Sequence, residues 1–267
     1  MDVGSRQFAE IGSGARRRRI AYRWTGTDAD DGKVALVWLS GFRADMEGTK
    51  ATTVAEWARA REVPILRFDY SAHGASDGAL IDATIGDWLE ESIAMFDLLG
   101  KRRAIVVGSS MGGWLALLLA RILAKHGASR RLAGLVLIAP AFDMTETLMW
   151  RVLPTEIKAK VEQEGVYYHA SAYGDPYPIT RRVIEEGRNH LLEASTFDPG
   201  CPVRIIQGMR DPDVPWRHAL ALVDLLDGDD VELNLIKEGD HRLSEPHDLR
   251  RLEATIAALL ASVRDHR

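Results

Sequence analysis

Short apolar runs typical of buried β-strands recur along the chain, with helical patterns of hydrophobicity between them. The strands predicted from these runs are 34–39, 65–68, 104–107, 134–139, 203–207 and 231–236. The helices predicted between and after them include 84–100, 111–124, 215–226 and 245–264. Strands that are apolar on both sides and alternate with helices are typical of parallel sheets covered on both faces. We therefore expect an α/β fold with a mostly parallel sheet and helices on both faces.

Two parts of the chain depart from this alternation. Residues 7–11 and 18–24 flank a Gly-Ser-Gly turn and predict an N-terminal antiparallel hairpin. Residues 142–195 contain prolines at 154, 176 and 178, and patterns of two or three amphipathic helices. That segment is too long for a loop and too short for a core of its own. We expect one domain, 1–267, in which 142–195 forms a small helical lid over the carboxyl edge of the sheet.

Composition restricts the classes of function. Hydrophobic residues make up 46% of the chain, charged residues 27%, and the net charge is −5, so nothing favours nucleic acid as a partner. Without a secretory leader or an apolar run of about 18 residues, we expect no membrane span and a cytoplasmic location. The single cysteine, Cys201, cannot form an internal disulfide. The arginine run 16–19 is expected to begin a solvated strand rather than to bind a polyanion, and the oligomeric state is left open.

The stretch 104–124 carries the first candidate for chemistry. Its turn, Gly108-Ser109-Ser110-Met111-Gly112, fits the pattern G-x-S-x-G between an apolar strand and an apolar helix. In such a turn small neighbours let the backbone pass closely, and the serine hydroxyl stands clear at the carboxyl edge of the sheet. Ser110 is therefore the candidate nucleophile. The amide of Met111 would face an oxyanion formed on it.

A base and an acid follow on later strands. His241 comes after the strand 231–236, and Asp211 comes after the strand 203–207, so both loops open at the same edge as Ser110. Neutral His241 would accept the Ser110 proton, and Asp211 would orient its ring. Asp213 is a rival for the acid, although Asp211 comes first after the strand. Asp240 is expected to be a surface or capping residue.

Further residues complete the expected site. The loop after the strand 34–39 would offer the amide of Phe42 as a second oxyanion donor, next to Gly41. Within the expected lid, Met149, Trp150 and His190 are candidate substrate contacts, although packing of the lid explains the first two equally well. No group of His, Asp or Cys residues has metal-ligand spacing, so no metal or organic cofactor is expected.

The motifs that carry these residues resemble the α/β-hydrolase superfamily. Within it they resemble the branch of mitochondrial palmitoyl-protein thioesterases that also cleave acyl-glucuronides. The motifs are Asp45-Met46, Gly48-Thr49-Lys50-Ala51, Arg67-Phe68-Asp69-Tyr70-Ser71, Ser76-Asp77-Gly78, Gly112-Gly113-Trp114-Leu115, Val214-Pro215-Trp216 and Asp240-His241-Arg242. The resemblance implies Ser110, Asp211 and His241 as nucleophile, acid and base, with oxyanion amides at Phe42 and Met111.

Together the residues and the resemblance predict a serine hydrolase for a small-molecule or acylated substrate. It would cleave an ester or thioester through an acyl-enzyme, as a carboxylesterase or a thioesterase would. The alternatives are a catalytically inactive hydrolase fold that serves as a small-ligand receptor, and a scaffold that binds partners. An intact serine, acid and histidine set argues against the receptor. The scaffold predicts that Ser110→Ala leaves the biological role intact, whereas an enzyme would lose it.

Overall fold

The structure is a computed structural model that describes residues 4–26, 32–171, 174–193 and 195–265. Its strands are β1 (Gln7–Ile11), β2 (Arg18–Trp24), β3 (Ala35–Leu39), β4 (Ile65–Phe68), β5 (Ala104–Ser109), β6 (Leu132–Ile138), β7 (Val166–Ser171), β8 (Gly174–Thr180), β9 (Val203–Gly208) and β10 (Val231–Ile236). Its α-helices are α1 (Thr49–Ala60), α2 (Ile85–Asp97), α3 (Met111–Lys125), α4 (Thr155–Glu164), α5 (Arg181–Gly187), α6 (Trp216–Leu225) and α7 (Pro246–Asp265). Short helical turns add η1 (Gly14–Arg16), η2 (Ser129–Arg131), the π-helix η3 (Thr145–Trp150) and η4 (Arg188–His190). None of the helices in these ranges has the length and apolar content needed to cross a membrane.

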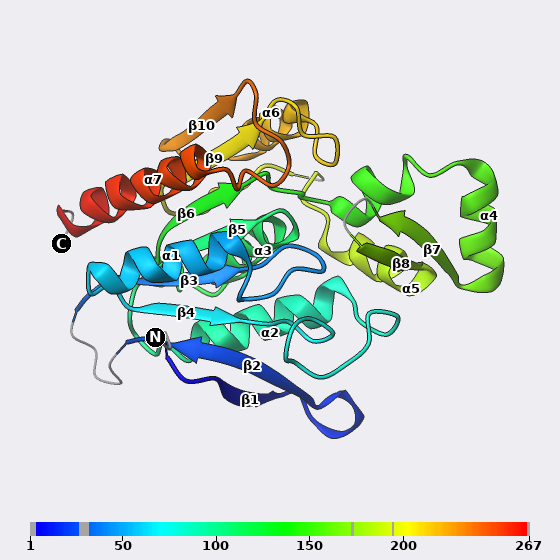
Figure 1. Cartoon of the computed structure of the whole chain (residues 1–267), viewed down its shortest axis with the longest axis horizontal. Helices are drawn as coiled ribbons and strands as arrows, with labels where there is room; N and C mark the ends of the chain where they lie inside the picture. Colours follow the sequence, from blue (N-terminus) through cyan, green and yellow to red (C-terminus); the bar gives the residue numbers. More distant parts are fainter. Residues whose placement is uncertain (1–3, 27–31, 172–173, 194, 266–267) are drawn as a thin grey trace.

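A central sheet organises the molecule (Figure 1). Its eight strands lie in the order β1-β2-β4-β3-β5-β6-β9-β10. The six strands from β4 to β10 pair in parallel, and only β2 with β4 and β1 with β2 pair antiparallel. The predicted mostly parallel sheet is confirmed, and β3, β4, β5 and β6 are buried at every residue, as expected of strands that are apolar on both sides.

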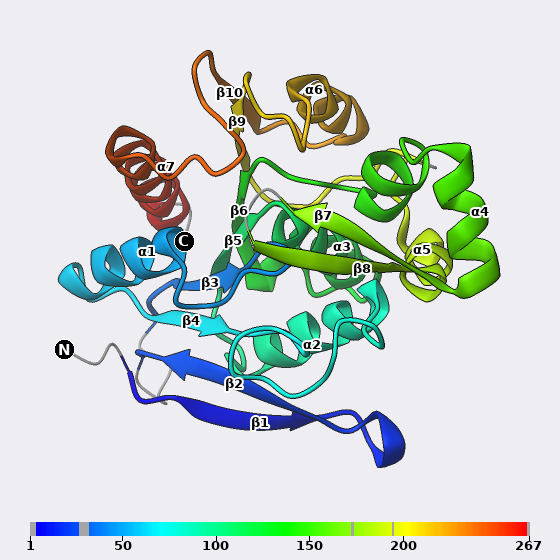
Figure 2. The same cartoon turned by 45° about the vertical axis from the view of Figure 1, so that its right-hand side comes forward.

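Helices cover both faces of this sheet (Figure 2). Side chains of successive strand residues point to opposite faces, so Val37 and Val106 pack with α2, α3 and α6, whereas Leu36 packs with α1 and α7. Both layers are fully buried at these positions. Loops at the carboxyl ends of the parallel strands therefore start from a rigid support.

The N-terminal hairpin is also confirmed, and it explains the arginine run. Only 13% of the Arg18 side chain is exposed, and its guanidinium donates to the buried carboxylate of Glu91 at 2.6 Å. Arg17 pairs with Glu10 across the hairpin, and Arg16 pairs with Asp87. The run begins β2 and is exposed at Arg16, Arg17 and Arg19, as expected, whereas Arg18 ties the hairpin to α2.

The segment 142–195 between β6 and β9, here called the inserted segment, lies beyond the carboxyl ends of the sheet strands (Figure 1). It contains the expected helices and also an antiparallel hairpin, β7–β8, that the sequence analysis missed. Pro178 argued against a strand, since proline cannot donate to a ladder. Both strands of a two-stranded sheet are edge strands, and an edge strand tolerates proline. Residues 172–173 and 194 of the segment lie outside the described residues.

A buried carboxylate joins the two ends of the inserted segment. Asp143 is fully buried, and its oxygens accept from the amide of Leu192 at 2.8 and 3.0 Å and from that of Glu193 at 2.9 Å. Burial raises the pKa of Asp143, and the amide hydrogen bonds oppose that shift. Arg121 of α3 donates to the carbonyl of Leu191 beside this contact. The base of the segment is thus fixed to the helix that follows Ser110.

Candidate active site

The turn between β5 and α3 holds Ser110 in an unusual backbone conformation. Its φ of 54° and ψ of −118° lie where side chains are rarely found, which lifts the hydroxyl out of the helix start. A Cβ on Gly112 would lie 2.1 Å from the Leu39 carbonyl oxygen, and one on Gly108 would lie 2.4 Å from the Gly112 oxygen. Both positions therefore require glycine. The Ser110 amide donates to the Ile138 carbonyl at 2.8 Å, which fixes the turn to β6.

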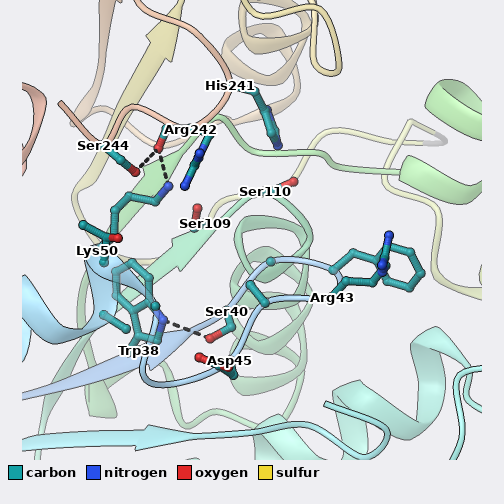
Figure 3. Close-up of a pocket in the computed structure, with 16 residues that line it drawn as sticks. Trp38, Ser40, Arg43, Asp45, Lys50, Ser109, Ser110, His241, Arg242 and Ser244 are labelled. Carbon is teal, nitrogen blue, oxygen red and sulfur yellow. Dashed lines mark hydrogen bonds between the residues drawn. The ribbon is translucent and has the colours of Figure 1, made fainter. Parts of the chain in front are cut away.

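The loop after β9 presents Asp211 with its carboxylate completely buried. One oxygen accepts from the amides of Asp213 at 2.9 Å and Val214 at 2.8 Å. The other oxygen accepts from the side-chain amide of Gln207 at 3.1 Å and lies 2.8 Å from His241 Nδ1. A carboxylate can only accept, so the His241 ring carries its proton on Nδ1 and keeps Nε2 free to accept. Figure 3 shows the ring of His241 pointing toward the Ser110 hydroxyl.

The two neighbouring acids occupy different positions. Asp213 is exposed, and its amide rather than its carboxylate contacts Asp211. Asp240 accepts from the Leu243 amide at 2.9 Å, which is the capping contact expected for it. Asp211, Asp213 and His241 could offer a metal three ligand atoms within 4.8 Å of one another. Asp211 already accepts hydrogen bonds at both oxygens, so its surroundings suit an orienting acid better than a metal ligand.

The loop after β3 passes directly beside the predicted nucleophile. A Cβ on Gly41 would lie 3.3 Å from Ser110 Cβ, so the backbone that leads to Phe42 runs close to Ser110. The amide of Arg43 donates to His73 Nε2 at 3.0 Å, and His73 Nδ1 donates to the Ser71 carbonyl at 2.9 Å. Burial lowers the pKa of His73, which keeps the ring neutral and able to accept at Nε2. His73, expected to be structural, thus supports this loop.

A cavity of about 520 Å³ opens beside Ser110, as Figure 3 shows. It is lined by Trp38, Ser40, Gly41, Phe42, Arg43, Ala44, Asp45, Gly48, Thr49, Lys50, Ala51, Ser109, Ser110, His241, Arg242 and Ser244. Lys50 donates to the Arg242 carbonyl, and Ser244 donates to the same oxygen at 2.9 Å. The sequence analysis gave Lys50 and Arg242 no role, although both belong to motifs that carry the family resemblance.

The predicted substrate residues of the inserted segment lie elsewhere. Met149 and Trp150 pack against a small cluster formed by Leu153, Ile179, Val183 and Ile184. His190 Nε2 lies 2.6 Å from a carboxylate oxygen of Glu186. The described lining of the cavity includes none of the three, and their contact with substrate stays a prediction. Tyr177 of this segment approaches the Phe42 loop, with its ring centroid 5.5 Å from that of Phe42.

The chain is similar to known proteins in both sequence and structure. Residues 36–264 match the sequence model of the Alpha/beta hydrolase family. A curated relative, the mitochondrial palmitoyl-protein thioesterase ABHD10 of Bos taurus, is 35% identical over 227 residues, which cover 84% of this chain and 72% of the relative. A crystal structure of a putative hydrolase from Agrobacterium vitis S4 superposes with a TM-score of 0.91 at 43% identity, covering 96% of this chain and 98% of that one. The structure of mouse alpha/beta hydrolase domain-containing protein 10 gives a TM-score of 0.84 at 30% identity, covering 97% and 100%.

Proposed function

The chain belongs to the α/β-hydrolase family, and we propose that it is a serine hydrolase that cleaves acyl esters or thioesters through an acyl-enzyme on Ser110. The family resemblance and the fold predicted from the sequence are thereby confirmed, and the relatives described as thioesterases support a hydrolase. The observation that carries the finer proposal is the 2.8 Å contact between His241 and the buried carboxylate of Asp211, beside Ser110. The cytoplasmic location stays a prediction, since the curated relative is described as mitochondrial.

In the proposed reaction, Ser110 Oγ attacks the acyl carbon while His241 Nε2 accepts its proton. The carbonyl electrons move to the oxygen, where the amides of Phe42 and Met111 stabilise the negative charge. Asp211 stabilises the imidazolium that forms, because its carboxylate is already bonded to Nδ1. The carbonyl then reforms, the bond to the leaving oxygen or sulfur breaks, and His241 gives that atom its proton. Water, activated by His241, releases the acid and restores Ser110.

We also propose that the inserted segment acts as a lid on this single domain. Its hairpin reaches the loop after β3 through Tyr177, which packs on Phe42 and lies under the guanidinium of Arg43 at 5.2 Å from the ring centroid. Closing the site from this side would exclude water from the charged intermediate, which strengthens the hydrogen bonds that stabilise it.

Hydrolysis of a matched panel tests the proposal. The panel consists of p-nitrophenyl esters of rising chain length, a long-chain acyl thioester and an aryl acyl-glucuronide. We expect the wild type to turn over at least one of them, and Ser110→Ala to lose at least about a thousandfold in kcat. Ser129→Ala, a serine substitution away from the cavity, is the control and should behave as wild type.

The panel also separates the competing functions. A preference for the long thioester identifies a depalmitoylase-like enzyme, and a preference for short esters or the glucuronide identifies a carboxylesterase. Absence of turnover, together with no labelling of Ser110 by a fluorophosphonate, would favour the inactive receptor instead.

A further inference from the structure

The cavity beside Ser110 has an excess of positive charge. Among its described lining residues, Arg43, Lys50 and Arg242 are cations, and Asp45 is the one carboxylate. That carboxylate accepts the backbone amide of Glu47 at 2.9 Å within its own loop. Two of the cations lie together on one wall of the cavity: Lys50 of α1 is beside Arg242 of the loop after β10, as Figure 3 shows.

Lys50 is held in this wall without an acidic partner. Its ammonium donates to the Arg242 carbonyl, and within the described ranges no carboxylate oxygen lies within 4.0 Å of it. Burial and, to a smaller extent, the charge of Arg242 lower the pKa of Lys50 to about 8, while the carboxylates of Asp240, Asp248 and Asp211 oppose the shift. Asp240 and Asp211 are hydrogen-bonded to groups of their own loops, and Asp248 lies 3.5 Å from Arg251.

Lys50 is partly buried and Arg242 is exposed, and two cations placed side by side repel each other, which costs free energy. An anion of the ligand placed between the two cations would make the electrostatic free energy favourable, since each cation would then attract the bound charge. An ammonium has three donors, of which the Arg242 carbonyl uses one, and a guanidinium offers a planar fork of donors. Such a pair suits oxygen anions that accept several hydrogen bonds, namely carboxylates and phosphates.

We propose that Lys50 and Arg242 bind an anionic group, a carboxylate or a phosphate, on the leaving group of the substrate. This inference rests on the proposed function, because it places the anion relative to the reaction at Ser110. The leaving atom must lie near His241 Nε2 to receive its proton. Arg242 is the next residue of the same loop and lines the same cavity as His241, so this wall is the leaving-group side.

The test compares two pairs of substrates, in each of which one leaving group carries an anion and the other is neutral. The ester pair consists of the butanoates of meta-carboxyphenol and meta-carbamoylphenol. The thioester pair consists of S-butanoyl pantetheine phosphate and S-butanoyl pantetheine. The ratio of kcat/KM within each pair is measured for the wild type, Lys50→Gln, Lys50→Arg and Arg242→Gln. Lys237→Gln, which removes the same charge from an exposed position outside the cavity lining, is the matched control.

In the wild type, we expect the anionic member of at least one pair to be preferred by about tenfold or more, the effect of one or two charge-assisted hydrogen bonds. Lys50→Gln and Arg242→Gln should each lower the ratio of kcat/KM for the anionic substrate to kcat/KM for the neutral one. Lys50→Arg should retain most of it, and Lys237→Gln should leave it unchanged. A preference confined to the esters identifies a carboxylate as the ligand, and one confined to the thioesters identifies a phosphate.

The inference is wrong if neither pair shows a preference in the wild type, or if Lys237→Gln lowers the ratio as much as Lys50→Gln. Both results leave the proposed function standing, provided that the neutral esters are hydrolysed and that Ser110→Ala abolishes this turnover. Turnover that persists in Ser110→Ala would instead remove the proposed function, and the assignment of the leaving-group side would fail with it.

Discussion

At the scale of single residues, hydrogen bonding distinguishes two acids that are close in sequence. Asp211 and Asp213 are separated by one residue, yet one is buried and the other is exposed. The tight turn after β9 sends the amides of Asp213 and Val214 back to the Asp211 carboxylate, and Gln207 approaches it from the strand. These donors fix the carboxylate so that one oxygen faces His241 Nδ1.

Exchange of each acid for its amide tests this distinction. In Asp211→Asn the side-chain amide can donate toward His241 Nδ1, which favours the wrong tautomer of the ring. We expect kcat for ester hydrolysis to fall by about a hundredfold to ten-thousandfold. Asp213→Asn makes the same chemical change two residues away and should stay within about threefold of wild type. Steady-state kinetics on one p-nitrophenyl ester measures both, and a larger loss in Asp213→Asn would reverse the assignment.

At the scale of elements, the loop after β3 depends on the loop after β4. The amides of Arg43 and Met46 donate to His73 and Asp69 respectively, so the donor at Phe42 is positioned by side chains from the neighbouring strand. The rings of Phe42 and His73 also meet edge to face at a centroid distance of 6.1 Å. The two loops therefore form one unit, and its stability depends on a neutral histidine.

The acid sensitivity of this unit can be measured. The pKa of His73 is lowered in the folded state, so between that value and the ordinary value of about 6.5 the unfolded chain binds a proton that the folded chain does not. The contribution of His73 to stability is thus complete above about pH 6.5. It is lost as pH falls toward the folded pKa, at up to about 1.4 kcal/mol per pH unit.

Urea unfolding between pH 7.5 and about 5 should therefore show a steeper loss of stability in wild type than in His73→Gln. His126→Gln removes a histidine that is exposed at the end of α3, and it should keep the wild-type slope. Equal slopes in wild type and His73→Gln would show that protonation of His73 does not couple to folding.

Elements that follow from local pattern were predicted well, and contacts between distant loops were not. The strands follow from apolar runs, and the helix start at residue 84 follows from the preference of threonine for that position, where the Thr84 hydroxyl accepts from the Asp87 amide. Lys50 and Arg242 are 192 positions apart and meet only because α1 and the loop after β10 pack side by side. The predicted positions of Ser110, Asp211 and His241 followed from strand order, since parallel strands bring their carboxyl ends to one edge.

At the scale of the whole molecule, the inserted segment has a buried carboxylate at its base, and Glu186 also joins the segment to α2 by accepting from the Gly86 amide at 3.0 Å. Asp143 accepts from the amides of Leu192 and Glu193, so one carboxylate closes the segment into a loop of its own. Arg121 of α3 holds the carbonyl of Leu191 from below. Motion of the segment as a whole would break the contact between Arg121 and Leu191, whereas motion of the outer hairpin alone would leave this contact and those of Asp143 in place.

Asp143→Asn tests whether this contact fixes the segment. An amide nitrogen in place of one oxygen would face a backbone donor in a buried site, so we expect a loss of about 2 kcal/mol in local stability. Hydrogen exchange measured by mass spectrometry should be faster in peptides from 145–171 and 174–190, because opening the base exposes their amides. Peptides from β5 and α3 should exchange at the wild-type rate, since the sheet core does not depend on Asp143.

The control is the same exchange of aspartate for asparagine at an exposed position. Asp229→Asn, in the exposed turn before β10, should leave exchange unchanged throughout the described residues. Faster exchange of the sheet core in Asp143→Asn would mean that the inserted segment unfolds together with the whole domain rather than as a local unit. Unchanged exchange everywhere would mean that packing of Thr145 against Gly187 and of the cluster around Ile179 is enough to hold the segment, with the carboxylate adding little.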